Sequence, residues 1–148
     1  MCIRDRGKFD LIVLDAFSSD SVPAHLMTLE ALDSYMSRLK PDGVVVFHIS
    51  NRFMELASVI EGAARARGFE AYYNSLDLRF WTPNAEKLDL RPYLAVVARS
   101  PAALRDLTSD PAWHGAEDNE VSPAWTDDYS NIIGAIWRNY SGKSPFDR

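Results

Sequence analysis

Asp15 is the residue best placed for chemistry, because it ends the apolar run at residues 11–14 and begins a polar turn. Strands buried on both faces of a parallel sheet are nearly unbroken runs of Ile, Val and Leu, because helices cover each side. Ligands of such sheets bind beyond the carboxyl ends of the strands, so an acid at this point would meet a ligand or substrate. Aspartate is also a common turn residue, and the position is equally compatible with capping the turn.

A second set of polar side chains follows another apolar run, residues 44–49. It contains His48, Ser50, Asn51 and Arg52, and a polar group that faces substrate is expected beyond this strand as well. His48 is more typical of a buried, hydrogen-bonded histidine than of a base. Arg52 is suited to a carboxylate substrate or to a surface salt bridge, and the pattern favours the salt bridge.

Strand and helix patterns alternate along the chain. Short apolar runs predict strands at residues 9–15, 44–49, 69–74 and 93–98. Apolar residues at helical spacing predict helices over residues 26–39 and 53–68, and a short helix begins at Ser100-Pro101. Residues 108–123 are polar and interrupted by prolines, which is typical of an irregular surface segment. Together these patterns predict an α/β layered fold with a mostly parallel sheet.

Turn and capping residues mark the helix ends. The turn Pro41-Asp42-Gly43 ends the first helix, and Gly68 is suited to the C-cap of the second. A last helix is expected over residues 127–140, with Asp127-Asp128 at its positive end, where acids are favourable. This helix carries one apolar stripe that is predicted to face the core: Tyr129, Ile132, Ile133, Ile136, Trp137 and Tyr140.

Composition excludes several classes of protein. The chain has 148 residues, which suits about one domain, and its 47% hydrophobic and 25% charged residues are ordinary globular values. It has neither ~20 consecutive apolar residues nor a signal-peptide pattern, so a cytoplasmic setting is expected. A net charge of −5 without a basic stripe argues against a nucleic-acid partner. The single Cys2 and the scattered histidines predict no metal site.

Three segments of the chain resemble one enzyme family. They read FDLIVLDAFSSD from residue 9, LKPDGVVVFHISN from residue 39 and WTDDYSN from residue 125. Over residues 9–140 the chain is similar to the spermidine synthase-like (polyamine aminopropyltransferase) branch of the class I S-adenosylmethionine-dependent methyltransferases. The resemblance implies the C-terminal half of a Rossmann-like methyltransferase sheet with flanking helices. Its four strands would be the fourth to seventh of seven, the last one antiparallel and inserted between its two predecessors.

The resemblance assigns catalytic roles to Asp15 and Asp20. Such acids hold a cationic amine and accept its proton, although typical synthases place them three apart and this chain places them five apart. The resemblance further implies that Pro23, Ala24 and Leu26 bind the cofactor. From their places in the expected turns and loops, the residues predicted to bind substrate are Ser18, Ser19, Asn51, Arg52 and Trp81. The cofactor-binding segment is also suited to a helix lead-in, and Trp81 to loop packing.

The activity implied by the resemblance is transfer of an aminopropyl group from decarboxylated S-adenosylmethionine to a small-molecule amine, without a metal. A fragment of an S-adenosylmethionine-dependent methyltransferase and a non-catalytic binding module are the alternatives. The family's first three strands and its glycine-rich cofactor loop have no counterpart here, since the glycines never form a Gly-x-Gly pair. We therefore expect the chain alone to be inactive, with weak or absent cofactor binding.

The two ends of the expected domain carry further expectations. Residues 1–8 have neither strand alternation nor a helical period, so we expect a non-native remnant there and one partial domain over residues 9–148. The strand at residues 9–15 would lack one neighbour, and an unpaired apolar edge favours self-association. Relatives of this branch also occur fused behind membrane segments, and the parent protein is a candidate for the same arrangement.

Overall fold

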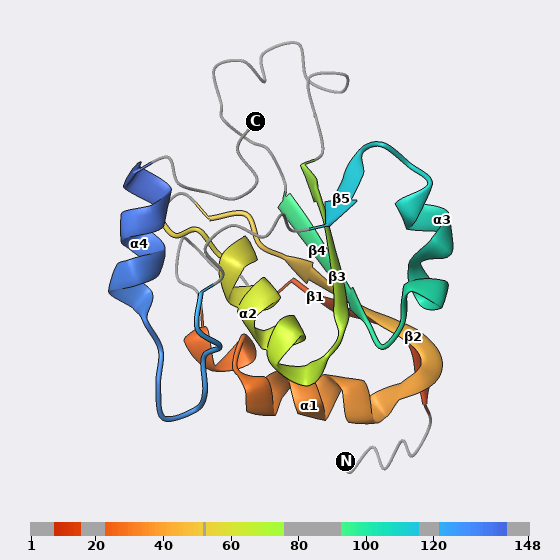
Figure 1. Cartoon of the computed structure of the whole chain (residues 1–148). Coiled ribbons are helices and arrows are strands. Elements are labelled where there is room, and N and C mark those ends of the chain that lie inside the picture. The colour runs from red at the N-terminus through yellow and green to blue at the C-terminus, as the bar shows by residue number, and fades with distance from the viewer. Residues whose placement is uncertain (1–7, 16–22, 52, 76–92, 116–121, 142–148) are drawn as a thin grey trace.

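The computed structural model describes residues 8–15, 23–51, 53–75, 93–115 and 122–141, which build an α/β fold around a mixed sheet (Figure 1). Its five strands are β1 (Phe9–Leu14), β2 (Leu39–His48), β3 (Glu70–Ser75), β4 (Tyr93–Ala98) and β5 (Trp113–Gly115). They lie side by side in the order β1-β2-β4-β3-β5. The sequence prediction of an α/β fold is confirmed. The expectation of a mostly parallel sheet is wrong, because β1 and β2 pair in parallel whereas the other three pairings among the described strands are antiparallel.

The position of β4 is the distinctive feature of the sheet. β1 pairs with β2 in parallel, whereas β4 pairs antiparallel with both β2 and β3 and so lies between its two predecessors. Residues 95–98 are all buried, as expected for a strand with neighbours on both edges and cover on both faces. This is the arrangement that the resemblance implies for the last four strands of a Rossmann-like methyltransferase sheet.

The strand β5 corrects the prediction of an irregular segment at residues 108–123. It pairs antiparallel with β3 and extends the sheet beyond that strand. Three residues are too few to display the alternation by which a strand is recognised in a sequence.

The start of β2 also differs from the prediction, since the strand already includes Pro41-Asp42-Gly43. The pairing with β1 shifts register there, from Phe9 opposite Leu39 to Leu11 opposite Val44. The expected turn is therefore absorbed as a bulge in the strand. A side chain at Gly43 would come within 2.9 Å of the Phe9 carbonyl oxygen, so this close approach requires glycine.

Two helices, α1 (Leu29–Arg38) and α2 (Ala57–Arg67), cover one face of the sheet. Thr28 is the N-cap of α1, where its Oγ1 accepts a hydrogen bond from the Ala31 N–H at 3.3 Å. Gly68 ends α2 with a φ of 66°, a left-handed conformation that favours glycine. The predicted C-cap at Gly68 is confirmed.

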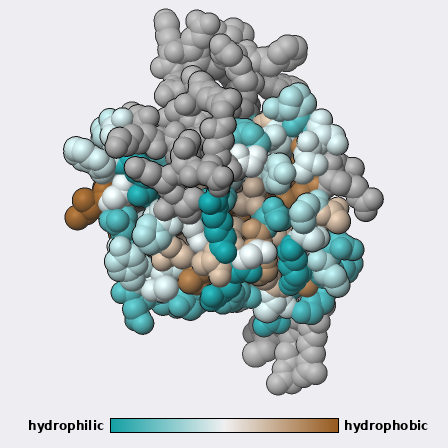
Figure 2. Space-filling view, in the orientation of Figure 1, coloured by the Kyte–Doolittle hydropathy of each residue, from teal (hydrophilic) through white to brown (hydrophobic). Residues whose placement is uncertain are grey.

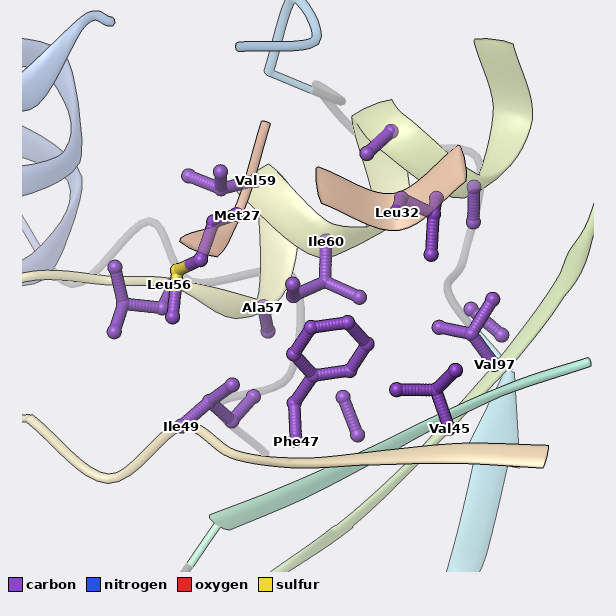
Figure 3. Packing of buried hydrophobic residues seen from close by; sticks show 14 of the residues in the cluster. Met27, Leu32, Val45, Phe47, Ile49, Leu56, Ala57, Val59, Ile60 and Val97 are labelled. Atoms are coloured by element: carbon purple, nitrogen blue, oxygen red, sulfur yellow. The ribbon is translucent and has the colours of Figure 1, made fainter. Parts of the chain in front are cut away.

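The main core lies between these helices and the sheet. Val45 and Phe47 of β2 and Val97 of β4 point toward Ile60 of α2 and Leu32 of α1 (Figure 3). Full burial of one such side chain stabilises the fold by about 1.5–3 kcal/mol. This packing anchors β2, whose last residue, His48, stands at the edge of the candidate site.

The opposite face of the sheet is covered over part of its width. The short helices η4 (Pro101–Leu104) and α3 (Arg105–Thr108) lie there, and Leu104 packs against Val96 and Ala98. The predicted helix start at Ser100-Pro101 is confirmed. β1 forms one edge of the sheet, and on this strand Leu11 and Val13 are exposed, with 60% of Val13 accessible.

The last helix, α4 (Ile132–Ser141), begins later and packs differently than predicted. Of its residues, Ala135 is buried, whereas Ile133, Trp137 and Tyr140 are exposed, with 69% of Trp137 accessible. Figure 2 shows the resulting hydrophobic protrusion at the left, over α4. The prediction of a buried stripe is wrong, because helical spacing reveals a stripe but not the surface that the stripe faces.

The acids predicted to begin this helix lie elsewhere. Asp127 is part of a turn closed by a bridge between Thr126 and Tyr129, ahead of α4. Its carboxylate accepts a hydrogen bond from Thr28 Oγ1 at 2.8 Å, and its N–H donates to Glu30 Oε2 at 3.1 Å. Asp127 therefore stabilises the positive end of α1 instead of α4.

No helix within the described ranges has the length and the apolar character needed to cross a membrane.

Candidate functional site

Asp15 and His48 lie side by side because of the register between two parallel strands. Leu14 pairs with Phe47 at the carboxyl ends of β1 and β2, so the next residue of each strand reaches the same level. Parallel strands present their carboxyl ends at one edge of the sheet, which is where ligands of such folds bind. The structure thus places the predicted acid Asp15 next to a histidine.

These two residues and Ser50 form a chain of hydrogen bonds that we call the strand-end cluster. His48 Nδ1 lies 2.8 Å from Asp15 Oδ1, and His48 Nε2 lies 2.9 Å from Ser50 Oγ. An ionised carboxylate only accepts hydrogen bonds, so the Nδ1 of His48 carries the proton. In the neutral ring Nε2 then accepts the hydroxyl proton of Ser50. The cluster therefore joins an acid, a potential base and a hydroxyl.

The strand-end cluster is open to solvent. The side chain of Asp15 is 68% exposed and that of His48 is 31% exposed. His48 is hydrogen-bonded as the sequence predicts, but it is partly and not fully buried. Even an exposed ion pair contributes only about 0–1 kcal/mol to stability, and an exposed hydrogen bond such as this one is not expected to contribute more. The fold does not depend on the cluster, and its polar groups are accessible to a small molecule.

Asn51 lies directly beyond the cluster and holds the turn that leads to α2. Its Oδ1 accepts hydrogen bonds from the N–H groups of Phe53 and Met54, both at 2.9 Å. This contact fixes the path of the chain after β2. A direct role for Asn51 in substrate binding stays a prediction.

The segment predicted to hold a cofactor is a helix lead-in that serves partly as core. Pro23 precedes the short helix η1 (Ala24–Leu26), and Ala24 packs against the main core. Leu26 lines a small pocket with Phe47 and Ile60 that has no room for a water molecule, so an adenine ring would not lie there. Pro23, Ala24 and Leu26 are all partly exposed, and a role for them in cofactor binding stays a prediction.

The other predicted site residues, Ser18, Ser19, Asp20, Arg52 and Trp81, lie outside the described residues. Of the residues expected at this edge, the structure describes Asp15, Ser50 and Asn51 there, and it joins Asp15 and Ser50 through His48, which the sequence did not favour as a functional residue. The signal that identifies His48 is its position at the end of the strand adjacent to β1. In the part of the chain that the structure describes, no group of three His, Cys, Asp or Glu side chains is placed to hold a metal ion.

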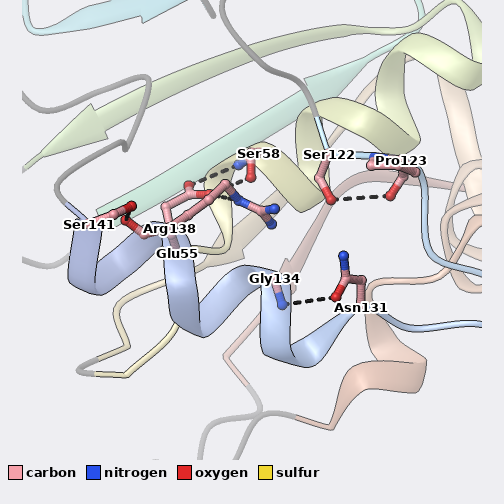
Figure 4. A network of polar contacts seen from close by, with 8 residues as sticks. All are labelled: Glu55, Ser58, Ser122, Pro123, Asn131, Gly134, Arg138 and Ser141. Atoms are coloured by element: carbon pink, nitrogen blue, oxygen red, sulfur yellow. Dashed lines mark hydrogen bonds and ion pairs between the residues drawn. The ribbon is translucent and has the colours of Figure 1, made fainter.

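A second polar group, which we call the buried network, joins α4 to the start of α2 (Figure 4). Glu55 is buried, and its Oε1 accepts a hydrogen bond from the Ser58 N–H at 2.9 Å. Its Oε2 accepts from the Ser58 hydroxyl and from Arg138 Nε, the latter at 3.3 Å. The Glu55 N–H donates to the Ala135 carbonyl at 3.0 Å. The charges of Glu55 and Arg138 face each other inside the fold, so we assign this network a structural role.

Comparison with known proteins gives a limited result. No family model matches the sequence, and no curated protein matches it. Among solved structures, MNMC2 from Aquifex aeolicus is similar, with 17% sequence identity and a TM-score of 0.42. The match covers 93% of this chain and 40% of that chain, so the chain spans less than half the length of that protein.

Proposed function

We propose that this chain is the acceptor-side half of an S-adenosylmethionine-dependent methyltransferase domain, and that the acceptor is an amine. The observation that carries the proposal is the exposed carboxylate of Asp15, joined to His48 at the carboxyl ends of β1 and β2. In sheets of this type the substrate lies beyond that edge. The reversed strand β4 supports the assignment to a methyltransferase-like sheet.

The chemistry of the cluster suits an amine. An amine is a cation at neutral pH, and a carboxylate binds it through charge-assisted hydrogen bonds. It must lose a proton before its nitrogen attacks, and a general base at the site supplies this step. S-adenosylmethionine, when bound, supplies an electrophilic methyl group on a sulfonium. Asp15 and His48 would hold the acceptor and remove its proton.

Methyl transfer is favoured over aminopropyl transfer by the neighbour of Asp15. Among the described residues, Asp15 contacts an imidazole and not a second carboxylate. A polyamine carries more than one positive charge, so its recognition calls for more than one acid. Asp20, the second acid implied by the resemblance, lies outside the described residues.

Donor binding is proposed to need a longer chain. Pro23, Ala24 and Leu26 are apolar and partly exposed, and we propose that they contact one side of the adenine ring. The chain has no Gly-x-Gly turn to approach the rest of the donor. Titration calorimetry of the 148-residue chain should therefore detect no micromolar binding of S-adenosylmethionine, and micromolar binding would contradict this part of the proposal.

The activity test uses the chain extended at its amino end by its natural coding sequence, which we call the extended chain. Incubated with S-adenosylmethionine labelled on its methyl group and a panel of amines, the extended chain should label an amine. Asp15→Asn should lower kcat/KM by about 10–10², because the variant loses the negative charge that attracts the cationic amine and a hydrogen bond to a charged group contributes about 1.5–3 kcal/mol. The matched control is Asp10→Asn, because Asp10 is an exposed acid of the same strand that pairs with Lys40.

Each alternative predicts another result in this assay. Transfer from decarboxylated S-adenosylmethionine alone would assign aminopropyl transfer. Failure of the extended chain to bind either donor would indicate a non-catalytic binding module. Equal losses in the Asp15 and Asp10 variants would remove Asp15 from the site.

A further inference from the structure

We propose that His48 is the final acceptor of the amine's proton, that Ser50 passes this proton on, and that Asp15 positions the imidazole. The inference rests on the proposed function, because it concerns the proton that the amine must lose. It assigns separate tasks to the three residues of the strand-end cluster.

The geometry of the cluster gives the imidazole a defined orientation. Asp15 Oδ1 accepts the Nδ1–H at 2.8 Å, and this contact leaves Nε2 as the basic nitrogen. Ser50 Oγ lies 2.9 Å from Nε2 on the other side of the ring. A base whose second nitrogen is held by a carboxylate has the arrangement by which hydroxyl groups are activated for proton transfer.

The imidazole is also the better chemical match for the task. An imidazole nitrogen is a stronger base than a carboxylate oxygen. General bases act best when their affinity for the proton matches the working pH. Asp15 keeps its charge in this scheme, so the imidazolium that forms on His48 stays next to a carboxylate.

The proton moves in one balanced step. One N–H bond of the ammonium breaks, and its electron pair stays on the nitrogen, which becomes the nucleophile. The released proton bonds to Ser50 Oγ while the hydroxyl's own proton moves to His48 Nε2. The imidazolium forms beside the Asp15 carboxylate, and the serine ends as it began. No further reactant is needed.

The first test examines the ring itself in the 148-residue chain. Nitrogen-15 couplings of the His48 imidazole distinguish a proton on Nδ1 from one on Nε2. At pH 8 we expect the Nδ1–H form in the native chain and a mixture with the Nε2–H form in Asp15→Ala. Asp10→Ala serves as the control and should match the native chain. A native chain with mainly the Nε2–H form would overturn the inference.

The second test adds n-butylamine as the probe and n-butanol as its uncharged control. The amine should shift the backbone signal of Asp15 and the ring signals of His48, and Ser50→Ala should remove only the ring response. If Asp15 responds and the native ring does not, the relay is wrong and the proposed function survives. If Asp15 does not respond, the proposed function itself fails.

The third test separates binding from proton transfer in the extended chain. His48→Gln should lower kcat by about 10²–10⁴ with little change in KM, since the base acts in the reaction step. Asp15→Asn should mainly raise KM, because asparagine still accepts from Nδ1 but no longer attracts the cation. A His48→Gln variant with native kcat would overturn the assignment.

Discussion

The strand-end cluster and the buried network use similar side chains for opposite purposes. In the buried network the carboxylate of Glu55 is enclosed, and its oxygens accept hydrogen bonds from Ser58 and Arg138. In the strand-end cluster Asp15 is mostly exposed, and among the described residues its side chain contacts His48. A polar group whose contacts are all internal supports the fold, whereas an exposed one at a strand end remains able to bind a ligand.

The largest expected effect on stability comes from the buried network. Arg138→Met leaves the Glu55 carboxylate buried without its cation, which typically costs about 3–5 kcal/mol. Urea unfolding measures this loss. The control is Arg67→Met, which breaks the surface pair with Asp33 and should cause a much smaller change. Equal losses of unfolding free energy in Arg138→Met and Arg67→Met would contradict this prediction, because a buried ion pair would then contribute no more than an exposed one.

Glu61 is a second buried carboxylate, and its hydrogen bond with Tyr73 allows a test of how stability depends on pH. Burial first, and then the charge and hydrogen bond of Glu61, raise the pKa of Tyr73 well above its usual value. The pKa of Tyr73 is higher in the folded state than in the unfolded state. The contribution of Tyr73 to the free energy of unfolding is therefore fully present below pH ~10 and is lost as the pH rises further. Tyr73→Phe should remove this alkaline loss of stability. At neutral pH it should cost about 1–3 kcal/mol, since Glu61 loses a buried donor. An unchanged alkaline profile would contradict the assignment.

Self-association through β1 would change the comparison between the strand-end cluster and the buried network. A strand of a second copy would then lie next to the strand-end cluster and cover part of it. The edge position of β1 and the exposed Leu11 and Val13 favour such pairing. We expect sedimentation to detect oligomers of the native chain, and Val13→Lys to shift them to monomers without unfolding the chain. A monodisperse native monomer would show that this edge does not pair.

The smallest expected effect on stability is that of Asp15→Asn. Its pair with His48 is exposed, so the free energy of unfolding should change by less than about 1 kcal/mol. The same substitution should strongly reduce transfer by the extended chain. A loss as large as that of Arg138→Met would make the strand-end cluster a structural element, and the two regions would no longer differ.

The sequence predicts the sheet better than it predicts the surroundings of the sheet. The runs that form β3 and β4, the cap at Gly68 and the helix start at Ser100-Pro101 are local signals, and the structure confirms them. The order of the strands was reached through the resemblance and not through periodicity. Strand runs, caps and helix starts depend on residues that are close in the sequence, so they can be predicted without a structure.

Contacts between distant segments account for the errors. The stripe on α4 was assigned to the core, but nothing in its spacing identifies a partner surface, and Trp137 is exposed. Asp127 was assigned to α4, yet it contacts Thr28. The sequence predicts Asp15 as a site residue but not its contact with His48, because the register that joins them depends on pairing between β1 and β2.

The contact between Asp127 and Thr28 also has a consequence for folding during synthesis. The two residues are separated by 99 positions, and Leu29 N–H further donates to the Trp125 carbonyl at 2.8 Å. The ribosome therefore releases α1 long before the residues that complete its amino end. Until Trp125 and Asp127 emerge, the nascent chain holds an unfinished helix end and lacks its fully buried indole. We expect final consolidation of the domain to wait for the last part of the chain, as closure of long loops generally delays folding.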